Sequence, residues 1–548
     1  MSSNKKLKDP IYGYIGIPIE YMNEIIDTAI FQRLRRIIQT SYSPLYSSAV
    51  HNRFVHSLGV FHLGKIASHY LRREMINKGH CDDLEKTLDR LGKIFLLACL
   101  LHDVGHAPFS HTGEEFYLDD RDLHKKLMEV VNSDALREDL PKTESIAAAP
   151  HEIMSAIIGI EEFSGFFYTQ EEKEFFARCI TGYKFSVSNK INDLKNCFVL
   201  LLNSKVIDVD KLDYLIRDAY ITGFATVNID YQRLLSALTI LFKENGRIEL
   251  GYYKTAISVI ENVVYAHDSE RKWIQNHPVV LYENYIIKHV LSALRDKLDT
   301  VDKSKKLFSL ESLSRDGQVL ENGLRVRLLC DDDIIYLMKT LCTDELSDEY
   351  FERKKRMHPI WKSESEYQAY VLAFSGTGGL LTNFENAMEI MIAYLKKNTD
   401  SWIINDALIA NLEHDLSALD KMESGDYGVD STSILAQKTD KKKILSVANC
   451  LKKYAAEKGI VYKFVILKAS QFNSGFSKSD FSKLGIVFPN SDKEDKCSEV
   501  GDIVSSLEAK LSKRPNFFYL FYDRGSSKRT DIDSDEICKR LLKLFFEN

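Results

Sequence analysis

Four short stretches of the sequence gather residues that can bind metal ions or transfer protons. They are HNRFVHSLGV (51–60), LLHDVGHAPFSH (100–111), APHEIM (149–154) and IDVDKLDYLIRD (207–218). The pair His102-Asp103 follows an apolar run, so we expect both side chains where a buried helix leaves the core. Imidazole plus carboxylate suits a borderline divalent ion such as Mn, Fe, Ni, Co or Zn.

The residues after this pair extend the candidate site into a loop. Gly105 and Pro108 end the regular helix, which makes His106 and His111 candidates for a loop at the site. In the first stretch, Arg53 stands three residues before His56, so a phosphate-binding guanidinium and a metal ligand can share one helix face.

The fourth stretch has helical spacing. Asp210, Tyr214 and Asp218 fall at i, i+4 and i+8, on one face of a helix, where they can place a metal ligand, an aromatic contact and a polar group in a row. Lys211 and Arg217 flank that face and can meet phosphate oxygens.

Each signal also has an ordinary structural interpretation. A single histidine on an apolar helix is usually a hydrogen-bonded core residue, and His62, His69 and His267 fit that description. An isolated His-Asp dipeptide arises by chance about once every few hundred residues. Lys211 and Tyr214 can be solvated side chains on a helix surface. It is the combination of the four stretches that favours a site.

The surrounding sequence predicts mainly helices in the first 300 residues. The predicted helices include Ile94–Leu101, Glu152–Ile158, Asn192–Leu202 and Tyr282–Leu294, with short extended pieces at Ile11–Ile17 and Arg247–Leu250. Residues 301–435 are helical but more polar. There Asp331-Asp332-Asp333 is expected to start a helix through Leu341, and Ser424–Ser433 to form a linker.

The last segment mixes both element types. We expect helices at Ile444–Lys458, Ile503–Leu511 and Ile537–Phe546, and strands at Tyr462–Leu467, Leu484–Phe488 and Phe517–Tyr522. This alternation predicts a small α/β domain. The sequence thus divides into a catalytic domain (1–300), a helical extension (301–435) and a C-terminal α/β domain (436–548).

Bulk properties narrow the class of protein. The 548 residues exceed the roughly 250–300 at which one core stops growing, so several domains are expected. A net charge of −6 gives no indication of a nucleic-acid or membrane-surface protein. No window approaches the ~20 apolar residues that span a bilayer, the N-terminus lacks a secretory signal, and nine dispersed cysteines form no CxxC pair. We therefore expect a cytoplasmic protein with reduced thiols.

The four stretches together resemble the HD superfamily, with its H…HD…D arrangement. They look most like the deoxynucleoside triphosphate (dNTP) triphosphohydrolases, which include bacterial dGTPases and the animal sterile-alpha-motif-and-HD-domain enzyme. The similarity runs from about Lys6 to Asp218 and continues weakly to about residue 360. It implies a mainly α fold with an HD-domain helical core. It also implies one divalent ion, of the metals above or Mg, held by His56, His102, Asp103 and Asp210.

The resemblance further implies roles for the other motif residues. The reaction would be attack of water on the α-phosphorus, which releases a deoxynucleoside and inorganic triphosphate. His111 matches the general acid, His106 its neighbour in the phosphate site, and the His151-Glu152 pair completes the pocket, with Asp103 also in the catalytic set. The residues that match substrate contacts are Arg53, Gln39, Lys211, Tyr214 and Asp218, with Gln39 and Asp218 at the sugar 3′-hydroxyl.

The N-terminal stretch resembles the part of the animal enzyme that binds an activating guanine nucleotide between subunits. The matching residues are Lys6, Asp27, Gln32 and Arg35. They imply nucleotide-activated assembly into a homo-oligomer, with a tetramer favoured. The alternative is that Asp27 caps a helix and that Gln32–Arg36 is the exposed face of that helix.

The sequence departs from the family pattern after Asn262. His267, Arg271 and Gln275 follow at four-residue steps, so Arg271 can supply a phosphate contact, but no tyrosine stands where the base-stacking one would. The leading interpretation is a dNTP triphosphohydrolase for dNTP-pool control or antiphage defence. The alternatives are an HD phosphodiesterase or nuclease acting on cyclic or short nucleotides, and a nucleotide-sensing subunit with little turnover.

Overall fold

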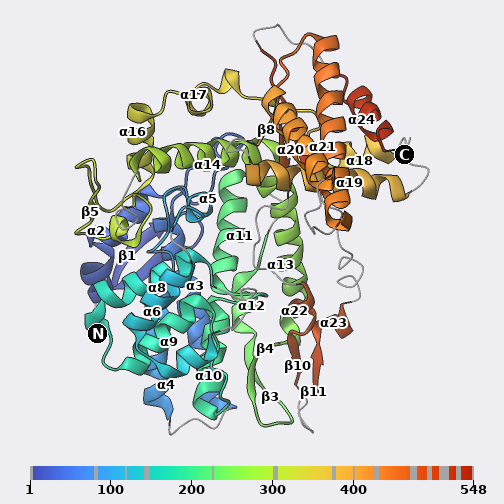
Figure 1. Ribbon diagram of the computed structural model, residues 1–548. Helices are drawn as coiled ribbons and strands as arrows, with labels where there is room; N and C mark the ends of the chain where they lie inside the picture. The colour runs from blue at the N-terminus through green and yellow to red at the C-terminus, as the bar shows by residue number, and fades with distance from the viewer. Residues whose placement is uncertain are drawn as a thin grey trace. The chain divides into compact units, whose positions relative to one another are not determined.

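The computed structural model of the protein is mainly α-helical (Figure 1). It describes residues 4–78, 84–117, 120–140, 148–224, 228–299, 306–372, 378–398, 402–424, 431–469, 478–489, 496–504, 517–525 and 532–545. The chain forms two compact units, each assembled from separated stretches. Unit 1 comprises 1–274, 290–342 and 474–512; unit 2 comprises 275–289, 343–473 and 513–548.

Six helices form the core of unit 1: α3 (Arg53–Asn77), α4 (Glu85–Leu101), α8 (Pro150–Glu162), α9 (Gln170–Thr181), α10 (Lys190–Leu202) and α11 (Val209–Thr222). Helix α3 packs against both α4 and α11, and α9 packs against α4 and α8. Four of them begin at side-chain caps that accept from a backbone N–H in the first turn: Asn52 on α3, Thr169 on α9, Asn189 on α10 and Asp208 on α11.

The remaining elements of unit 1 surround this core. They are β1 (Asn4–Asp9), β2 (Gly13–Pro18), α1 (Ile19–Tyr21), η1 (Met22–Ile26), α2 (Ala29–Arg33), η2 (Leu34–Arg36), α5 (His111–Glu114), α6 (Asp120–Val131), α7 (Asp134–Asp139), η5 (Ser164–Phe166), α12 (Tyr231–Ser236), β3 (Leu238–Phe242), β4 (Ile248–Tyr253), η6 (Lys254–Ala256), α13 (Ile257–Glu270), α15 (Leu310–Leu313), β5 (Gln318–Val319), β6 (Arg325–Val326), α16 (Asp331–Leu341), α22 (Lys478–Ser482), β10 (Gly485–Phe488), β11 (Lys496–Glu499) and α23 (Val500–Ile503).

Unit 2 is built from the later elements. They are α17 (Glu345–Phe351), η8 (Arg353–Lys355), β7 (His358–Pro359), α18 (Glu364–Leu372), α19 (Gly378–Asn398), β8 (Ile403–Ile404), α20 (Asp406–Ser424), α21 (Ser431–Lys458), β9 (Phe464–Lys468), β12 (Phe518–Tyr522) and α24 (Ser534–Lys543). Two further helices, η7 (Arg271–Gln275) and α14 (Pro278–Leu298), have residues in both units.

Two sheets of four strands divide the C-terminal strands between the units. In unit 1 the order is β11-β10-β4-β3, with β10 parallel to β4, and in unit 2 it is β7-β12-β9-β8. The strands predicted in the last segment are present as β9, β10 and β12, but they belong to two different sheets. The predicted boundaries at 300 and 435 stay predictions, because compact units and functional domains are different divisions of a chain.

Most predicted elements are confirmed, with shifted ends. The apolar run before His102 is the buried end of α4, and α16 spans Asp331–Leu341 as expected. Residues 425–430 of the expected linker, and 505–511 of the helix expected at 503–511, lie outside the described residues. The eight cysteines in the described part of the chain are free thiols. Among the described helices, none has the length and apolar character needed to cross a membrane.

Candidate active site

The four predicted metal ligands converge in unit 1 from three helices. His56 lies in the first turn of α3, His102 and Asp103 follow α4 directly, and Asp210 lies in the first turn of α11. The Nε2 atoms of His56 and His102 are 3.3 Å apart, and Asp210 Oδ1 lies 2.9 Å and 3.5 Å from them. The Asp103 carboxylate lies 3.6 Å from His56 Nε2 and 3.5 Å from His102 Nε2.

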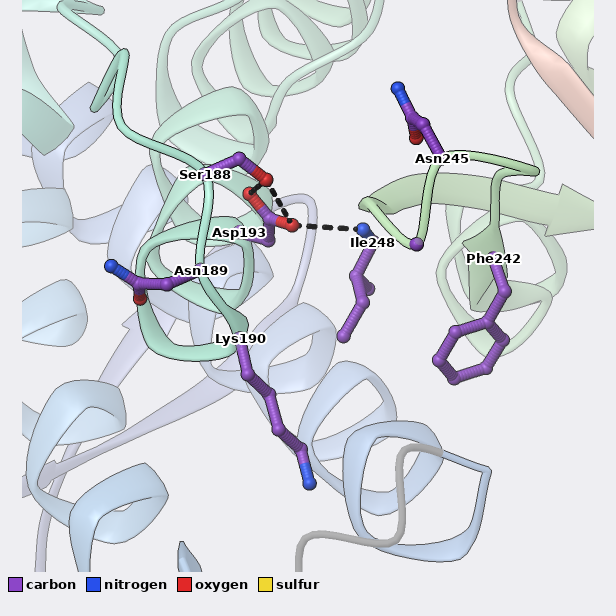
Figure 2. A pocket seen from close by; sticks show the side chains of 8 residues that line it. Ser188, Asn189, Lys190, Asp193, Phe242, Asn245 and Ile248 are labelled. Atoms are coloured by element: carbon purple, nitrogen blue, oxygen red, sulfur yellow. Dashed lines mark hydrogen bonds between the residues drawn. The ribbon is translucent and has the colours of Figure 1, made fainter.

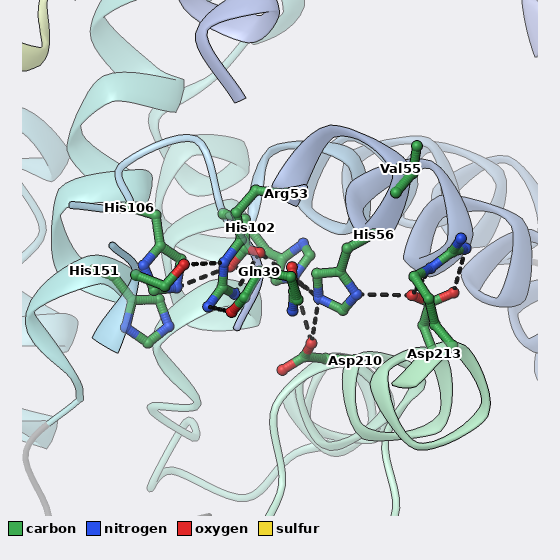
Figure 3. Close-up of polar contacts among 12 residues, drawn as sticks. Gln39, Arg53, Val55, His56, His102, His106, His151, Asp210 and Asp213 are labelled. Atoms are coloured by element: carbon green, nitrogen blue, oxygen red, sulfur yellow. Dashed lines mark hydrogen bonds and ion pairs between the residues drawn. The ribbon is translucent and has the colours of Figure 1, made fainter. Parts of the chain in front are cut away.

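The hydrogen bonds behind the two imidazoles fix which nitrogen faces the centre. His56 contacts Asp213 (Figure 3), with Nδ1 2.7 Å from Oδ2, and His102 Nδ1 is 3.0 Å from the carbonyl oxygen of Cys99. Both acceptors require an N–H at Nδ1, so both Nε2 lone pairs point at each other. Two facing lone pairs beside carboxylates need a cation between them.

The raised pKa of His56 also indicates that this group of side chains favours a cation. Burial would lower the pKa of His56, but hydrogen bonds to Asp210 and Asp213 outweigh it and raise that pKa to about 10. Side chains that retain a proton so strongly also favour a divalent ion in its place. The histidine and carboxylate donors therefore fit the predicted metal.

Arg53 ties Asp103 to the neighbouring loops. Its Nη1 donates to Asp103 Oδ2 at 2.8 Å, its Nε to Ser110 Oγ at 2.9 Å and its Nη2 to the Gln39 carbonyl at 3.4 Å. Burial would raise the pKa of Asp103, but Arg53 and the histidines hold it well below its usual range. Arg53 thus keeps this carboxylate ionised.

A second group of titratable side chains lies on the other side of Asp103. Glu114 Oε1 is 3.3 Å, 3.0 Å and 2.9 Å from the Nδ1 atoms of His106, His111 and His151. His106 Nε2 is also 3.5 Å from Asp103 Oδ1. The three histidines are predicted site residues, whereas Glu114 was not predicted. Glu114 stands three residues after His111 on one short helix, and this spacing could have identified it as a site residue.

The ring planes show that this second group is suited to protons. The rings of His106 and His151 stack 4.1 Å apart at an interplanar angle of 16°. Imidazole lone pairs lie in the ring plane, so two parallel rings cannot direct them to one ion. Burial would raise the pKa of Glu114, but His151 and His111 hold it well below its usual range. Burial would lower the pKa of His151, but Glu114 raises it to about 9.

Glu152, predicted to complete the pocket with His151, makes other contacts. Its Oε2 accepts from the backbone N–H of Ala149 at 2.7 Å, and its Oε1 accepts from Asn203 Nδ2 at 2.8 Å. These bonds close the first turn of α8. Among the described residues, the carboxylate that joins the histidines is Glu114.

Two remote residues hold the loop between α4 and α5. Arg33, buried on α2, donates to the carbonyls of Val104, His106 and Leu329 at 2.8–2.9 Å. Asp331, at the start of α16, accepts from the backbone N–H groups of Phe109 and Ile38 at 2.7 Å and 2.8 Å.

The backbone of this loop is strained where Asp331 holds it. Phe109 and Ser110 have φ angles of 57° and 54°, in the left-handed region that costs a side-chain-bearing residue about 1–3 kcal/mol. Neither Arg33 nor Asp331 was predicted as part of the site.

The residues predicted at the sugar end lie close together. Asp218 Oδ1 is 2.8 Å from His51 Nε2, and the backbone N–H of Gln39 donates to the His51 carbonyl at 3.0 Å. Gln39 is buried, and its Oε1 has no hydrogen-bond partner within the described parts of the chain. Gln39 and Asp218 are therefore joined through His51, which the sequence analysis did not select.

The remaining predicted phosphate and sugar contacts lie on α11 and just beyond α13. Lys211 Nζ donates to Asp208 and to the Ser204 carbonyl, both at 2.8 Å. Burial would lower its pKa, but Asp208 and Asp210 raise it, so it stays charged. The buried Tyr214 hydroxyl has no partner in the portion of the chain described. Arg271 lies near enough to His267 to lower its pKa, which burial already lowers.

The predicted activator residues lie near the surface at the N-terminus. Lys6 on β1 and Asp27 after η1 are exposed. Gln32 donates to the Ile26 carbonyl at 2.7 Å and accepts from Arg35 Nε at 2.9 Å. The alternative in which Asp27 caps the helix does not hold, because Thr28 is the N-cap of α2.

A surface pocket elsewhere in unit 1 is lined by Asp193 and its neighbours (Figure 2). Among its described lining residues, no buried side-chain nitrogen or oxygen lacks a hydrogen-bond partner. Asp193 accepts from Ser188 Oγ at 3.1 Å and from the backbone N–H of Ile248 at 3.1 Å. Its carboxylate is thus used to join the start of α10 to β4. We assign no site to this pocket.

Comparison with known proteins agrees with the motif and its geometry. The family model described as "HD domain" matches residues 53–163. An uncharacterized protein of Bacillus subtilis is 31% identical over 45% of this chain and 48% of its own length. The deoxynucleoside triphosphate triphosphohydrolase homolog of Dictyostelium discoideum is 33% identical over 42% of this chain and 39% of its own length. The human deoxynucleoside triphosphate triphosphohydrolase is 29% identical over 44% of this chain and 37% of its own length.

A solved structure shares the overall fold. It is the crystal structure of a hypothetical protein from Aquifex aeolicus, with a TM-score of 0.54, 17% identity and coverage of 98% of this chain and 100% of that one. The chain thus contains an HD domain and has dNTP triphosphohydrolase homologues, although it spans about half or less of the length of the curated relatives described above.

Proposed function

We propose that this HD-domain protein is a metal-dependent phosphohydrolase that converts a dNTP to a deoxynucleoside and inorganic triphosphate. The observation that carries the proposal is the pair of facing Nε2 atoms of His56 and His102 between Asp103 and Asp210. The Dictyostelium and human relatives, which are named as deoxynucleoside triphosphate triphosphohydrolases, support the choice of substrate.

A divalent ion held by these four side chains would supply Lewis-acid activation of water and of phosphoryl oxygens. The chain's own cations complete the phosphate environment. Arg53 is fixed by three acceptors, and Lys211 stays charged beside Asp208. Both can stabilise negative charge that grows on the phosphoryl group during attack on the α-phosphorus.

His111 is the group placed to protonate the leaving 5′ oxygen. Its side chain is 51% exposed, unlike the buried His106, so it can reach a bound ligand. Glu114 lies 3.0 Å from its Nδ1, which leaves Nε2 to donate a proton. The oxygen of water forms a bond to the α-phosphorus and loses a proton to solvent. The bond from phosphorus to the 5′ oxygen breaks with its electron pair on that oxygen, which takes the proton from His111, so the products are a deoxynucleoside and a triphosphate that carries the water oxygen.

Product identification tests the activity. The purified protein is incubated with each dNTP, each rNTP and cyclic dinucleotides in the presence of Mn²⁺ or Mg²⁺. Triphosphate plus deoxynucleoside in equal amounts is the expected result, and Asp103→Ala should abolish it while the exposed Asp332→Ala should not. Diester cleavage would assign a phosphodiesterase instead, and binding without any product would assign a nucleotide-sensing subunit.

We also propose activation by a guanine nucleotide or dNTP, coupled to assembly of a homo-oligomer, with a tetramer favoured. The exposed Lys6 and Asp27 and the linked Gln32 and Arg35 support it, since an acid can accept from guanine N–H groups and cations can hold phosphates. Mass and rate should rise together on addition of GTP or a dNTP, and Asp27→Ala should remove the response. The exposed Glu24→Ala is the control; unchanged mass and rate in the wild type would refute activation.

The cellular role that fits this activity is control of the dNTP pool or starvation of phage replication. Expression of the wild type in phage-infected cells should lower dNTP concentrations and phage yield. Asp103→Ala should do neither; equal effects of the two proteins would exclude a role through hydrolysis.

A further inference from the structure

The turn between β1 and β2 is connected to a buried ion-pair network. Asp9 Oδ1 accepts from the backbone N–H groups of Ile11 and Tyr12 at 2.8 Å and 3.0 Å, which closes the turn. Asp9 Oδ2 accepts from Arg217 Nη1 at 3.0 Å. One carboxylate therefore fixes both the shape of the hairpin turn and the position of a guanidinium on α11.

The network converges on Asp213, one turn after Asp210 on α11. Tyr12 donates its hydroxyl to Asp213 Oδ1 at 2.8 Å, and Arg217 donates to both carboxylate oxygens at 2.8 Å and 3.0 Å. The third partner is His56, whose Nδ1 makes the fourth contact at 2.7 Å from Oδ2. Asp213 is fully buried, so these four contacts replace its solvation.

The close approach of α3 and α11 depends on a glycine. A Cβ at Gly59 would overlap the Asp213 carboxylate and the Arg217 guanidinium. The glycine in the HSLGV stretch is thus explained by the space that Asp213 and Arg217 occupy against α3. Any larger residue there would displace the carboxylate that orients His56.

We propose that the β1–β2 turn is an outer layer of the metal site, in which Tyr12 and Arg217 position Asp213 so that it orients the metal-binding histidine His56. A ligand histidine binds best when its second nitrogen donates to a fixed acceptor, and loss of such an outer partner typically weakens metal binding about 10- to 100-fold. The turn lies outside the matched residues 53–163, yet it contributes to the affinity of that domain for its ion.

This inference rests on His56 being a metal ligand and not on the identity of the substrate. The test therefore measures metal binding directly, without nucleotide. The full chain is stripped of metal, and the dissociation constant for Mn²⁺ is measured by competition with a chelator of known affinity. A protein that binds Mn²⁺ but hydrolyses no dNTP would refute the proposed function and leave this inference open to the same measurement.

The decisive variant is Tyr12→Phe, which removes one hydroxyl from the network. The dissociation constant is expected to rise about tenfold, and kcat is expected to return to the wild-type value at saturating Mn²⁺. Tyr14→Phe is the matched control on the same hairpin, because its side chain is 64% exposed, and it should bind as the wild type does. An unchanged constant in Tyr12→Phe, or an equal loss in Tyr14→Phe, overturns the proposal.

A spectroscopic readout separates positioning from a general loss of stability. Co²⁺ bound to the wild type and to Tyr12→Phe should give visible spectra that differ, since the orientation of His56 changes, whereas Tyr14→Phe should match the wild type. If Tyr12→Phe does not fold, the same comparison is made with Asp213→Asn, which keeps the volume and removes the charge. Identical spectra in the folded variant would show that the network does not position the ligand.

Discussion

Two clusters of histidine and carboxylate groups lie on either side of Asp103, and they have different chemistry. In the first, His56 and His102 direct their Nε2 lone pairs at each other beside Asp210. In the second, the parallel rings of His106 and His151 both turn Nδ1 towards Glu114. The same residue types are thus suited to hold a metal or a proton according to the planes of their rings, and in the first cluster hydrogen bonds to Asp213 and Cys99 set those planes.

Asp103 contacts both clusters, so its loss should have the largest effect. Asp103→Asn removes a charge that balances Arg53 and both metal-binding histidines. We expect hydrolysis to fall to background and Mn²⁺ binding to weaken, as measured by product release and by chelator competition. A variant that keeps full metal affinity would show that Asp103 belongs to the second cluster alone.

Glu114→Gln should affect the proton-holding cluster only. Without the carboxylate that stabilises the protonated imidazole, the rate should fall about 10²- to 10⁴-fold, measured as kcat at saturating metal. The Mn²⁺ dissociation constant should stay at the wild-type value. A parallel loss of metal from Glu114→Gln would mean that the second cluster also binds an ion.

Metal removal should distinguish the clusters through stability. At a metal concentration of 100 times the dissociation constant, binding adds about 2.7 kcal/mol to the free energy of unfolding. This increment should persist in Glu114→Gln and disappear in His102→Ala, as measured by thermal unfolding with and without chelator. Persistence in His102→Ala would contradict the assignment of the first cluster.

Asp331 offers a smaller, pH-dependent effect on the loop between the clusters. Burial raises its pKa to about 7, above the ~3.9 of an unfolded aspartate. The folded state therefore binds more protons between these values, and its contribution to stability falls as pH rises from about 4 to about 7.

The variant Asp331→Asn should reveal that contribution. Its amide nitrogen would face one of two backbone N–H donors, so we expect a loss of about 1–3 kcal/mol. The difference from the wild type should shrink as pH rises, in chemical unfolding at pH 4.5 and 7.5. Asp332→Asn on the same helix is the control; a difference independent of pH would refute the raised pKa.

The sequence was sufficient to predict the site residues that lie in local motifs. His56, His102, Asp103 and Asp210 were predicted from three of the four stretches, and the structure brings them together. Glu114 could have been found, since it stands at i+3 from His111 on the same short helix. The role of Glu152 stays a prediction, and in the structure its carboxylate accepts from a backbone N–H in the first turn of α8.

Local sequence patterns do not predict contacts between segments that are far apart in the chain. Arg33 and Asp331 have no motif, and their bonds to the 104–109 loop join residues that are 71 positions apart for Arg33 and Val104 and 222 positions apart for Asp331 and Phe109. The C-terminal strands were predicted one by one from their apolar alternation. Their division between two sheets depends on pairing with β4 and with β7 and β8, which neither composition nor periodicity encodes.

The bonds from Asp331 to the loop after Asp103 have a consequence for biosynthesis. At about 5–20 residues per second, the ribosome needs roughly 10–50 s to extend the nascent chain from Asp103 to Asp331. During that interval the left-handed turn at Phe109 and Ser110 lacks the acceptor that holds it. Acquisition of the native loop therefore follows translation of α16, and a growing chain shorter than this lacks the carboxylate that accepts from Phe109.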